Sequence, residues 1–168
     1  LDTSLDATQR DYILEANNAA QSLLGILNDI LDFSKIEAGK LTFEKVPFYL
    51  DKLLNVLQSV AGLTAREKGL ELEFIIDKNV PKRLVGDPLR LRQVLTNLIS
   101  NAVKFTHQGK ITVRVSLLEQ EKDSNRVRLY FEIRDTGIGI SKAQQLHLFE
   151  AFSQGDSSIT RRFGGTGL

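Results

Sequence analysis

A run of apolar residues that recurs every three or four positions across residues 6–40 limits the possible folds more than any other part of the sequence. The recurrence predicts one long helix that ends at Gly39. Two neighbouring apolar stripes make its buried face wide. The first stripe is Ile13, Ala16, Ala20, Leu23, Leu27 and Ile30, and the second is Tyr12, Ala19, Ile26 and Phe33. No other segment offers a matching long partner, so we expect this helix to pair with a missing segment, another chain, or both.

The rest of the chain alternates between strand and helix patterns. The predicted strands are 40–46, 70–76, 110–118 and 126–135, and the predicted helices are 49–68, a helix that begins at Pro88, and 141–152. Gly69 is placed to end the second helix, and Asp87 precedes Pro88 as an N-cap. The order predicts a helical arm followed by an α/β (α+β) sandwich, with a mixed sheet covered by helices on one face.

Composition narrows the class of protein. The 168 residues are 42% hydrophobic, which is enough for a core, and 22 basic against 21 acidic residues leave a net charge of +1. This balance predicts no nucleic-acid partner. The absence of Cys excludes a disulfide framework and a thiolate metal site. Short apolar runs predict no membrane contact by this segment. The chain has no Met, even at its first position, which we interpret as a sign of an excised segment.

A polar stripe follows the helix that begins at Pro88. Arg90, Gln93, Asn97, Asn101 and Lys104 are spaced by three or four residues and so share one edge of the helix. A solvated surface is the ordinary interpretation of such a stripe. Asn is a poor helix former, however, and its amide oxygen can bind a hard cation without adding charge. A lysine one turn further on could meet a phosphate, so the stripe is a candidate site.

Two glycine-rich stretches are further candidates. In "RDTGIGI", Asp135 could accept a hydrogen bond from an exocyclic amine, while Gly137 and Gly139 would let a flat base approach the backbone. Simple turn chemistry is the alternative. In "FEAFSQGDSSITRRFGGTGL", a surface linker is possible, but successive backbone N–H groups near Arg161 and Arg162 suit a mobile phosphate lid.

The order of these motifs identifies a resemblance. "NLISNAVKFT", "DTGIGI", "LFEAFSQ" and "GGTGL" resemble the asparagine box, first glycine box, phenylalanine box and second glycine box of sensor histidine kinases. The arm "LLGILNDILDFSKIEAGKL" is similar to the second helix of their dimerisation and phosphotransfer domain, closest to the hybrid kinases. The resemblance implies that residues 1–40 are part of that domain. Residues 41–168 would be a Bergerat-type ATP-binding domain, cut inside its lid.

The resemblance also implies residue roles. Asp135 would accept the adenine amine, Asn101 would bind Mg²⁺, and Asn97 and Lys104 would serve the phosphates as catalytic groups. Phe149 and Phe152 would pack and hinge the lid, and either Arg161 or Arg162 could reach the γ-phosphate. The residues implied to bind ATP are Asn97, Asn101, Lys104, Asp135, Gly137, Ile138, Gly139, Gly165, Thr166, Gly167 and Leu168.

The implied activity is transfer of the γ-phosphoryl of ATP to a histidine and thence to an aspartate of a response-regulator receiver domain. The acceptor is expected to be absent from this segment, since neither His107 nor His147 has the expected context. The segment alone should therefore not phosphorylate itself. The resemblance further implies a homodimer through the N-terminal helix, in the cytoplasmic part of a membrane-anchored sensor.

Two alternatives stay open. One is a regulatory module that binds nucleotide without catalysis, although intact Asp135 and Asn101 disfavour it. The other is an ATPase of the same fold. Such ATPases carry a Glu at the position of Asn97 to activate water, and an amide cannot take a proton.

Overall fold

The structure is a computed structural model of the chain, and it describes residues 5–120 and 125–146. One compact unit comprises Phe43–Ser141, and the described residues on either side of it belong to a second unit. Each unit is described by itself. Among the helices that the structure describes, none is long and apolar enough to cross a membrane.

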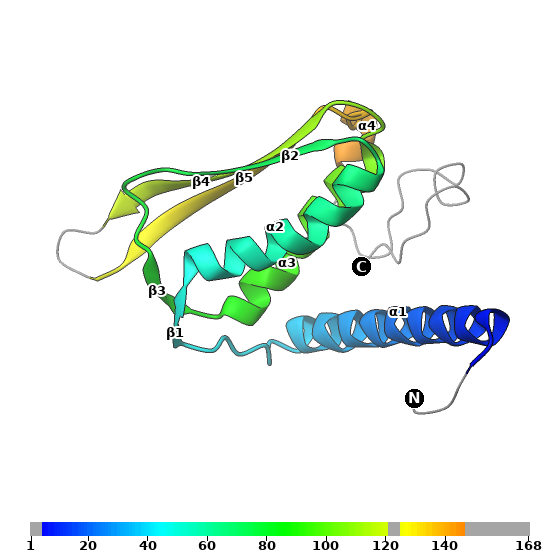
Figure 1. Cartoon of the computed structure of the whole chain (residues 1–168). Helices are drawn as coiled ribbons and strands as arrows, with labels where there is room; N and C mark the ends of the chain where they lie inside the picture. The colour runs from blue at the N-terminus through cyan, green and yellow to red at the C-terminus, as the bar shows by residue number, and fades with distance from the viewer. Residues whose placement is uncertain (1–4, 121–124, 147–168) are drawn as a thin grey trace. The chain divides into compact units, whose positions relative to one another are not determined.

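The predicted N-terminal helix is α1, Ala7–Glu37 (Figure 1, blue). It begins with a capping box: Asp6 Oδ1 accepts from the Gln9 backbone N–H at 2.8 Å, and Gln9 Oε1 accepts from the Asp6 N–H at 3.1 Å. Gly39 follows the helix with φ of +63°, a conformation that favours glycine. The predicted helix and its end at Gly39 are confirmed.

The remaining elements are β1 (Val46–Tyr49), α2 (Leu50–Glu67), β2 (Glu71–Ile76), β3 (Arg83–Gly86), α3 (Pro88–Phe105), β4 (Lys110–Gln120), β5 (Val127–Asp135) and α4 (Lys142–Leu146). A three-stranded mixed sheet has the order β2-β4-β5, with β2 parallel and β5 antiparallel to β4. Strands β1 and β3 form a separate antiparallel pair. The mixed sheet predicted from the sequence is confirmed.

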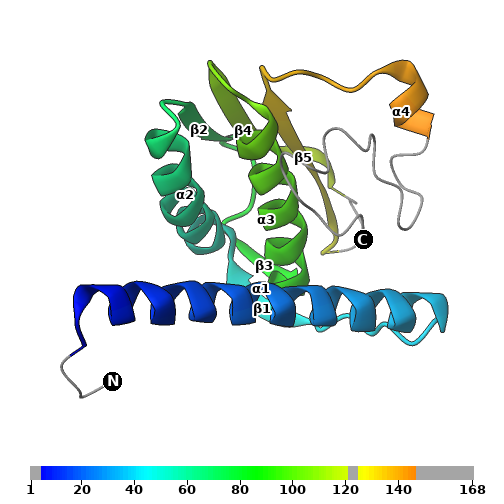
Figure 2. The same ribbon diagram turned by 90° about the vertical axis from the view of Figure 1, so that its right-hand side faces the viewer.

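One face of the three-stranded sheet forms the core with α2 and α3, which lie on the same side of it (Figures 1 and 2). The register places alternate residues of the three strands on that face. Its members are Leu72 and Phe74 of β2, Ile111, Val113 and Val115 of β4, and Leu129, Phe131 and Ile133 of β5. The helices contribute, among others, Leu50, Leu54, Leu57, Leu95 and Ile99. The predicted two-layer α/β sandwich is therefore confirmed.

Two element predictions need correction. The predicted strand at 40–46 is wrong, because residues 40–45 are irregular and the strand begins only at Val46. The Glu44 backbone N–H donates to the Asp87 side chain at 3.1 Å instead of to a neighbouring strand. The sequence also missed β3, whose four residues are too few to show a clear alternation. The short helix predicted at 141–152 is described only as α4, since residues 147–152 lie outside the described residues.

Candidate functional site

Helix α3 is held at its first turn by Asp87. One carboxylate oxygen of Asp87 accepts from the Arg90 backbone N–H at 3.0 Å, and the other accepts from the Glu44 N–H at 3.1 Å. These backbone hydrogen bonds, that of Arg90 first, lower the pKa of the Asp87 carboxyl from its usual value. The predicted N-cap is confirmed, and its second bond ties α3 to the segment before β1.

The polar stripe of α3 is on the surface, as its spacing predicts. The Leu95, Ile99, Ala102 and Val103 side chains are buried on the opposite face. Along the stripe, Arg90 Nη1 donates to Gln93 Oε1 at 2.8 Å. The Asn101 Nδ2 amide donates to Asn97 Oδ1 over a long 3.5 Å, so the two amides of the predicted site face each other on adjacent turns. Both asparagines are exposed and accessible to a ligand.

The "DTGIGI" loop packs against the C-terminal end of α3. The Ile138 backbone N–H donates to the Phe105 carbonyl at 3.4 Å. A Cβ added at Gly137 would lie only 2.5 Å from that carbonyl oxygen and 2.9 Å from Asp135 Oδ1, so a side chain there would force the loop away. Gly139 has φ of +68°, which also favours glycine. Both glycines thus have a structural reason within the loop itself, and their role beside a flat base stays a prediction.

Asp135 is the last residue of β5 and shapes its own loop. Its Oδ1 atom accepts from the Gly137 backbone N–H at 2.8 Å. Within the described residues, no hydrogen bond to its Oδ2 atom is present, and the residue is exposed. One carboxylate oxygen therefore sets the turn while the other can accept a hydrogen bond from a ligand.

Sequence reasoning missed Thr136. Its Oγ1 atom accepts from the Lys110 backbone N–H at 3.1 Å and lies 3.4 Å from the Gln108 and Lys110 carbonyls. Gly109, with φ of +112°, leaves room for this hydroxyl, since a Cβ there would collide with it. The sequence did offer a signal for Thr136. A hydroxyl residue directly follows Asp135, and a glycine turn directly precedes a predicted strand. Thr136 fastens the loop to the start of β4.

The structure thus joins two of the three predicted motifs. Phe105, which contacts the loop, is one residue after Lys104 and one turn after Asn101. Lys104 is half-buried, with its Nζ atom 5.1 Å from the centroid of the Phe105 ring. The third motif cannot be placed: Phe149, Phe152, Arg161, Arg162, Gly165, Thr166, Gly167 and Leu168 lie outside the described residues, as does His147.

The protein groups of the site can supply only part of the coordination of a hard cation. Within residues 5–120 and 125–146 no cluster of three His, Cys, Asp or Glu side chains could hold a metal ion. The contact between the two asparagines uses the Nδ2 atom of Asn101, which leaves its Oδ1 atom for a cation. A single amide oxygen is a weak ligand set, so phosphate oxygens would have to complete the coordination.

A known family model matches the part of the chain that carries the candidate site. Residues 86–168 match the family model "Histidine kinase-, DNA gyrase B-, and HSP90-like ATPase". Helix α3 and the loop after β5 both lie in the matched region, so the match covers both parts of the candidate site.

Sequence relatives extend the match to the whole chain. The chain is 48% identical to the signal transduction histidine-protein kinase BarA of Escherichia coli (strain K12), over 100% of this chain and 18% of that protein. It is 50% identical to the sensor histidine kinase GacS of Pseudomonas protegens, over 99% of this chain and 18% of that protein. The chain is thus homologous to sensor histidine kinases and spans about a fifth of the length of these relatives.

Solved structures agree on the fold. Full-length ShkA, crystallised in complex with AMPPNP, matches 99% of this chain and 33% of its own with a TM-score of 0.75 and 31% sequence identity. The Acinetobacter baumannii histidine kinase AdeS matches 86% of this chain and 67% of its own with a TM-score of 0.65 at 21% identity, which supports the fold alone. The sandwich therefore shares the α/β fold of these solved structures.

Proposed function

We propose that this chain is the ATP-binding catalytic segment of a sensor histidine kinase. In the reaction, the γ-phosphorus forms a bond to a histidine nitrogen while its bond to the ADP oxygen breaks, and a receiver aspartate then takes the phosphoryl group. The contact of Ile138 and Gly137 with Phe105 carries the proposal, because it brings a base-binding loop against the helix end that bears Asn101 and Lys104. Homology to kinases such as BarA and GacS supports it.

The adenine end of the site depends on Asp135. Because its Oδ1 atom holds the turn through the Gly137 N–H, its Oδ2 atom is oriented and ready to accept the adenine amine. Ile138 is exposed beside it and offers an apolar surface to the base. Gly137, Ile138 and Gly139 would therefore form one wall of the adenine pocket.

The phosphate end depends on the last two turns of α3. Mg²⁺ bound to the phosphates would neutralise charge that develops during transfer, and Asn101 Oδ1 is the protein ligand we assign to it. Lys104 would contact a phosphate as a point charge, and Asn97 would position the Asn101 amide. The Asn97 amide cannot take a proton from water, which favours transfer to a side chain over hydrolysis.

The N-terminal helix would serve the dimer. We infer that residues 1–40 are part of the dimerisation and phosphotransfer domain and that two copies pair through the apolar stripes of α1. The exposed Leu23, Leu27 and Ile30 side chains support this inference. A response-regulator receiver domain would be the second partner, and the segment would work in the cytoplasm as part of a membrane-anchored sensor.

Replacing Asp135 by Asn tests the adenine assignment. The new Oδ1 can still accept from the Gly137 N–H, which leaves an NH₂ group facing the adenine amine, donor against donor. We expect the affinity for Mg-ATP to fall by about 1–3 kcal/mol, or roughly 5- to 150-fold, in titration calorimetry. Inosine triphosphate carries a carbonyl in place of the amine, so the preference for ATP over this nucleotide should shrink or reverse in the variant.

Asp77→Asn is the matched control, because it removes the same charge from a residue that pairs with Arg114 at 3.4 Å, outside the candidate site. Asp77→Asn should leave the affinities for ATP and for inosine triphosphate unchanged. Equal losses of ATP affinity in the two variants would mean that the effect comes from the change in net charge alone. An Asp135→Asn protein with normal ATP affinity and normal preference for ATP would refute the assignment.

A further inference from the structure

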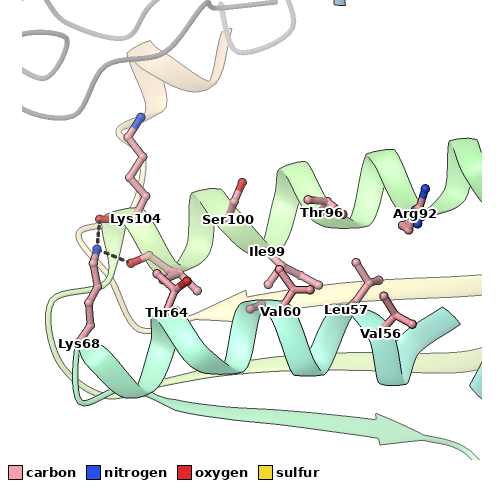
Figure 3. Close-up of a pocket in the computed structure, with 12 residues that line it drawn as sticks. Val56, Leu57, Val60, Thr64, Lys68, Arg92, Thr96, Ile99, Ser100 and Lys104 are labelled. Atoms are coloured by element: carbon pink, nitrogen blue, oxygen red, sulfur yellow. Dashed lines mark hydrogen bonds between the residues drawn. The ribbon is translucent and has the colours of Figure 1, made fainter. Parts of the chain in front are cut away.

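A groove of about 450 Å³ runs between α2 and α3, separate from the loop that follows β5. Val56, Val60 and Thr64 line it from α2, and Thr96, Ser100 and Val103 line it from α3 (Figure 3). The groove floor includes Leu57 and Ile99, which belong to the core. The hollow therefore borders the hydrophobic core of the sandwich.

The walls of the groove carry exposed apolar side chains that the hydrophobic core does not use. The Val60 side chain is 68% exposed and that of Val56 is 50% exposed, so neither contributes much to the core. They stand one turn apart on α2, on the same edge of the groove. Exposed apolar side chains that border a concave surface are typical of a binding site for another protein.

The ends of the groove are basic. Arg92 lies at one end, and Lys68 and the stem of Lys104 lie at the other (Figure 3). The Lys68 Nζ atom donates to the Val103 carbonyl at 2.9 Å and to the Lys104 carbonyl at 3.4 Å, which holds its charge at that end. Among the described residues that line the groove, none is acidic. The sequence of α3 contains Arg90, Arg92 and Lys104 but no Asp or Glu.

The length of the groove matches a short helix. Arg92 and Lys104 are twelve residues apart on α3, which at a rise of about 1.5 Å per residue is about 18 Å, or three helical turns. Apolar walls, basic ends and this length together define the occupant. We propose that the groove binds an amphipathic helix of a partner protein, with apolar side chains between α2 and α3 and carboxylates at both ends.

A labelled probe peptide tests the proposal on the intact 168-residue chain. The probe is a helix-stabilised peptide of about 14 residues with Leu and Ala on one face and two Glu at each end, and binding is followed by fluorescence anisotropy. We expect Val60→Lys to weaken binding at least about tenfold, since it places a charge in the apolar wall. The matched control is Leu63→Lys, because Leu63 is 63% exposed on the same helix but does not line the groove.

A second pair of variants tests the basic ends. Arg92→Glu should weaken binding of the acidic peptide about threefold or more and improve binding of a peptide with Lys in place of Glu. Arg66→Glu makes the same change on α2 outside the groove and should have little effect. Thermal unfolding of all four variants should match that of the unaltered chain, because every altered side chain is exposed.

Several outcomes would overturn the proposal. They are absence of binding by the acidic peptide, equal binding of the acidic and basic peptides, and equal losses in Val60→Lys and Leu63→Lys. Self-association of the chain that Val60→Lys abolishes would also overturn it, since the occupant would then be a second copy. Saturable binding that only the groove variants weaken would confirm it.

Discussion

Helices α1 and α2 both carry apolar stripes but differ in how far these stripes are buried. In α2, Leu50, Leu53, Leu54 and Leu57 are between 1% and 9% exposed, because the sheet and α3 pack against them. In α1, Leu23 is 67% exposed and Leu27 is 51% exposed. A hydrophobic pattern therefore predicts that a face needs a partner, but the pattern does not say whether the partner lies in the same folded unit.

The N-caps of α1 and α3 differ in a similar way. Within the described residues, Asp6 bonds only to its own helix, through the Gln9 N–H, whereas Asp87 at the start of α3 also bonds to the Glu44 N–H, 43 residues earlier. The Asp6 cap is therefore local to α1, and the Asp87 cap links two distant segments of the sandwich. Loss of one interaction should consequently have a local effect in α1 and a wider effect in the sandwich.

The largest expected effect comes from truncating matched leucines in the two helices. Leu54→Ala removes a side chain that is 2% exposed and should lower the free energy of unfolding of the sandwich by about 2–5 kcal/mol. Leu27→Ala in α1 should change it by less than about 0.5 kcal/mol, because the side chain is half exposed. Denaturant unfolding followed by circular dichroism measures both. Similar losses in the two variants would show that α1 and the sandwich unfold as one cooperative unit.

The next effect concerns association through α1. Combining Leu27→Lys with Ile30→Lys should weaken self-association at least about a hundredfold, since two apolar side chains of the proposed dimer interface become charged. Sedimentation velocity over a range of concentrations measures this change. Asn28→Lys adds a charge to the same turn outside the apolar stripes and should preserve the dimer. A chain that is monomeric before and after the double substitution would contradict a dimer through α1.

The smallest effect should come from the Asp87 cap. Asp87→Ala should destabilise the sandwich at neutral pH, and the difference from the unaltered chain should disappear in acid. Because the backbone N–H groups of Arg90 and Glu44 lower the pKa of Asp87 in the folded state, its stabilisation is complete above the ordinary carboxyl range. It is lost as the pH falls through the lowered pKa.

Unfolding of the two proteins in denaturant at several pH values tests the Asp87 prediction, with Asp6→Ala as the control cap in α1. The control should reduce helicity slightly without changing the unfolding midpoint of the sandwich. A stability difference between the Asp87→Ala protein and the unaltered chain that stays constant into strong acid would mean that the carboxylate is not the stabilising group.

Much of the fold could be predicted from local sequence. Regular periodicity over nine or more residues predicted α1, α2, β4 and β5, and the N-cap Asp87 with Pro88 predicted the start of α3. The four-residue strands β1 and β3 could not be predicted in the same way. They exist because Val46 and Phe48 pair with Gly86 and Leu84 nearly forty residues away. Short strands take their conformation from such pairing more than from their own residues.

By itself, the sequence determined which residues share a helix face and that a glycine such as Gly139 can take a left-handed turn position, because both properties depend on near neighbours and backbone angles. Asn97 and Asn101 are on one edge of α3 for this reason, and Gly139 adopts a positive φ. Only the tertiary structure decided that Gly137 meets the Phe105 carbonyl, that Thr136 fastens the loop to β4, and that Lys68 holds the end of α3. These contacts join residues 26 to 35 positions apart, and packing of α2 and α3 on the sheet, not local preference, brings such distant residues together.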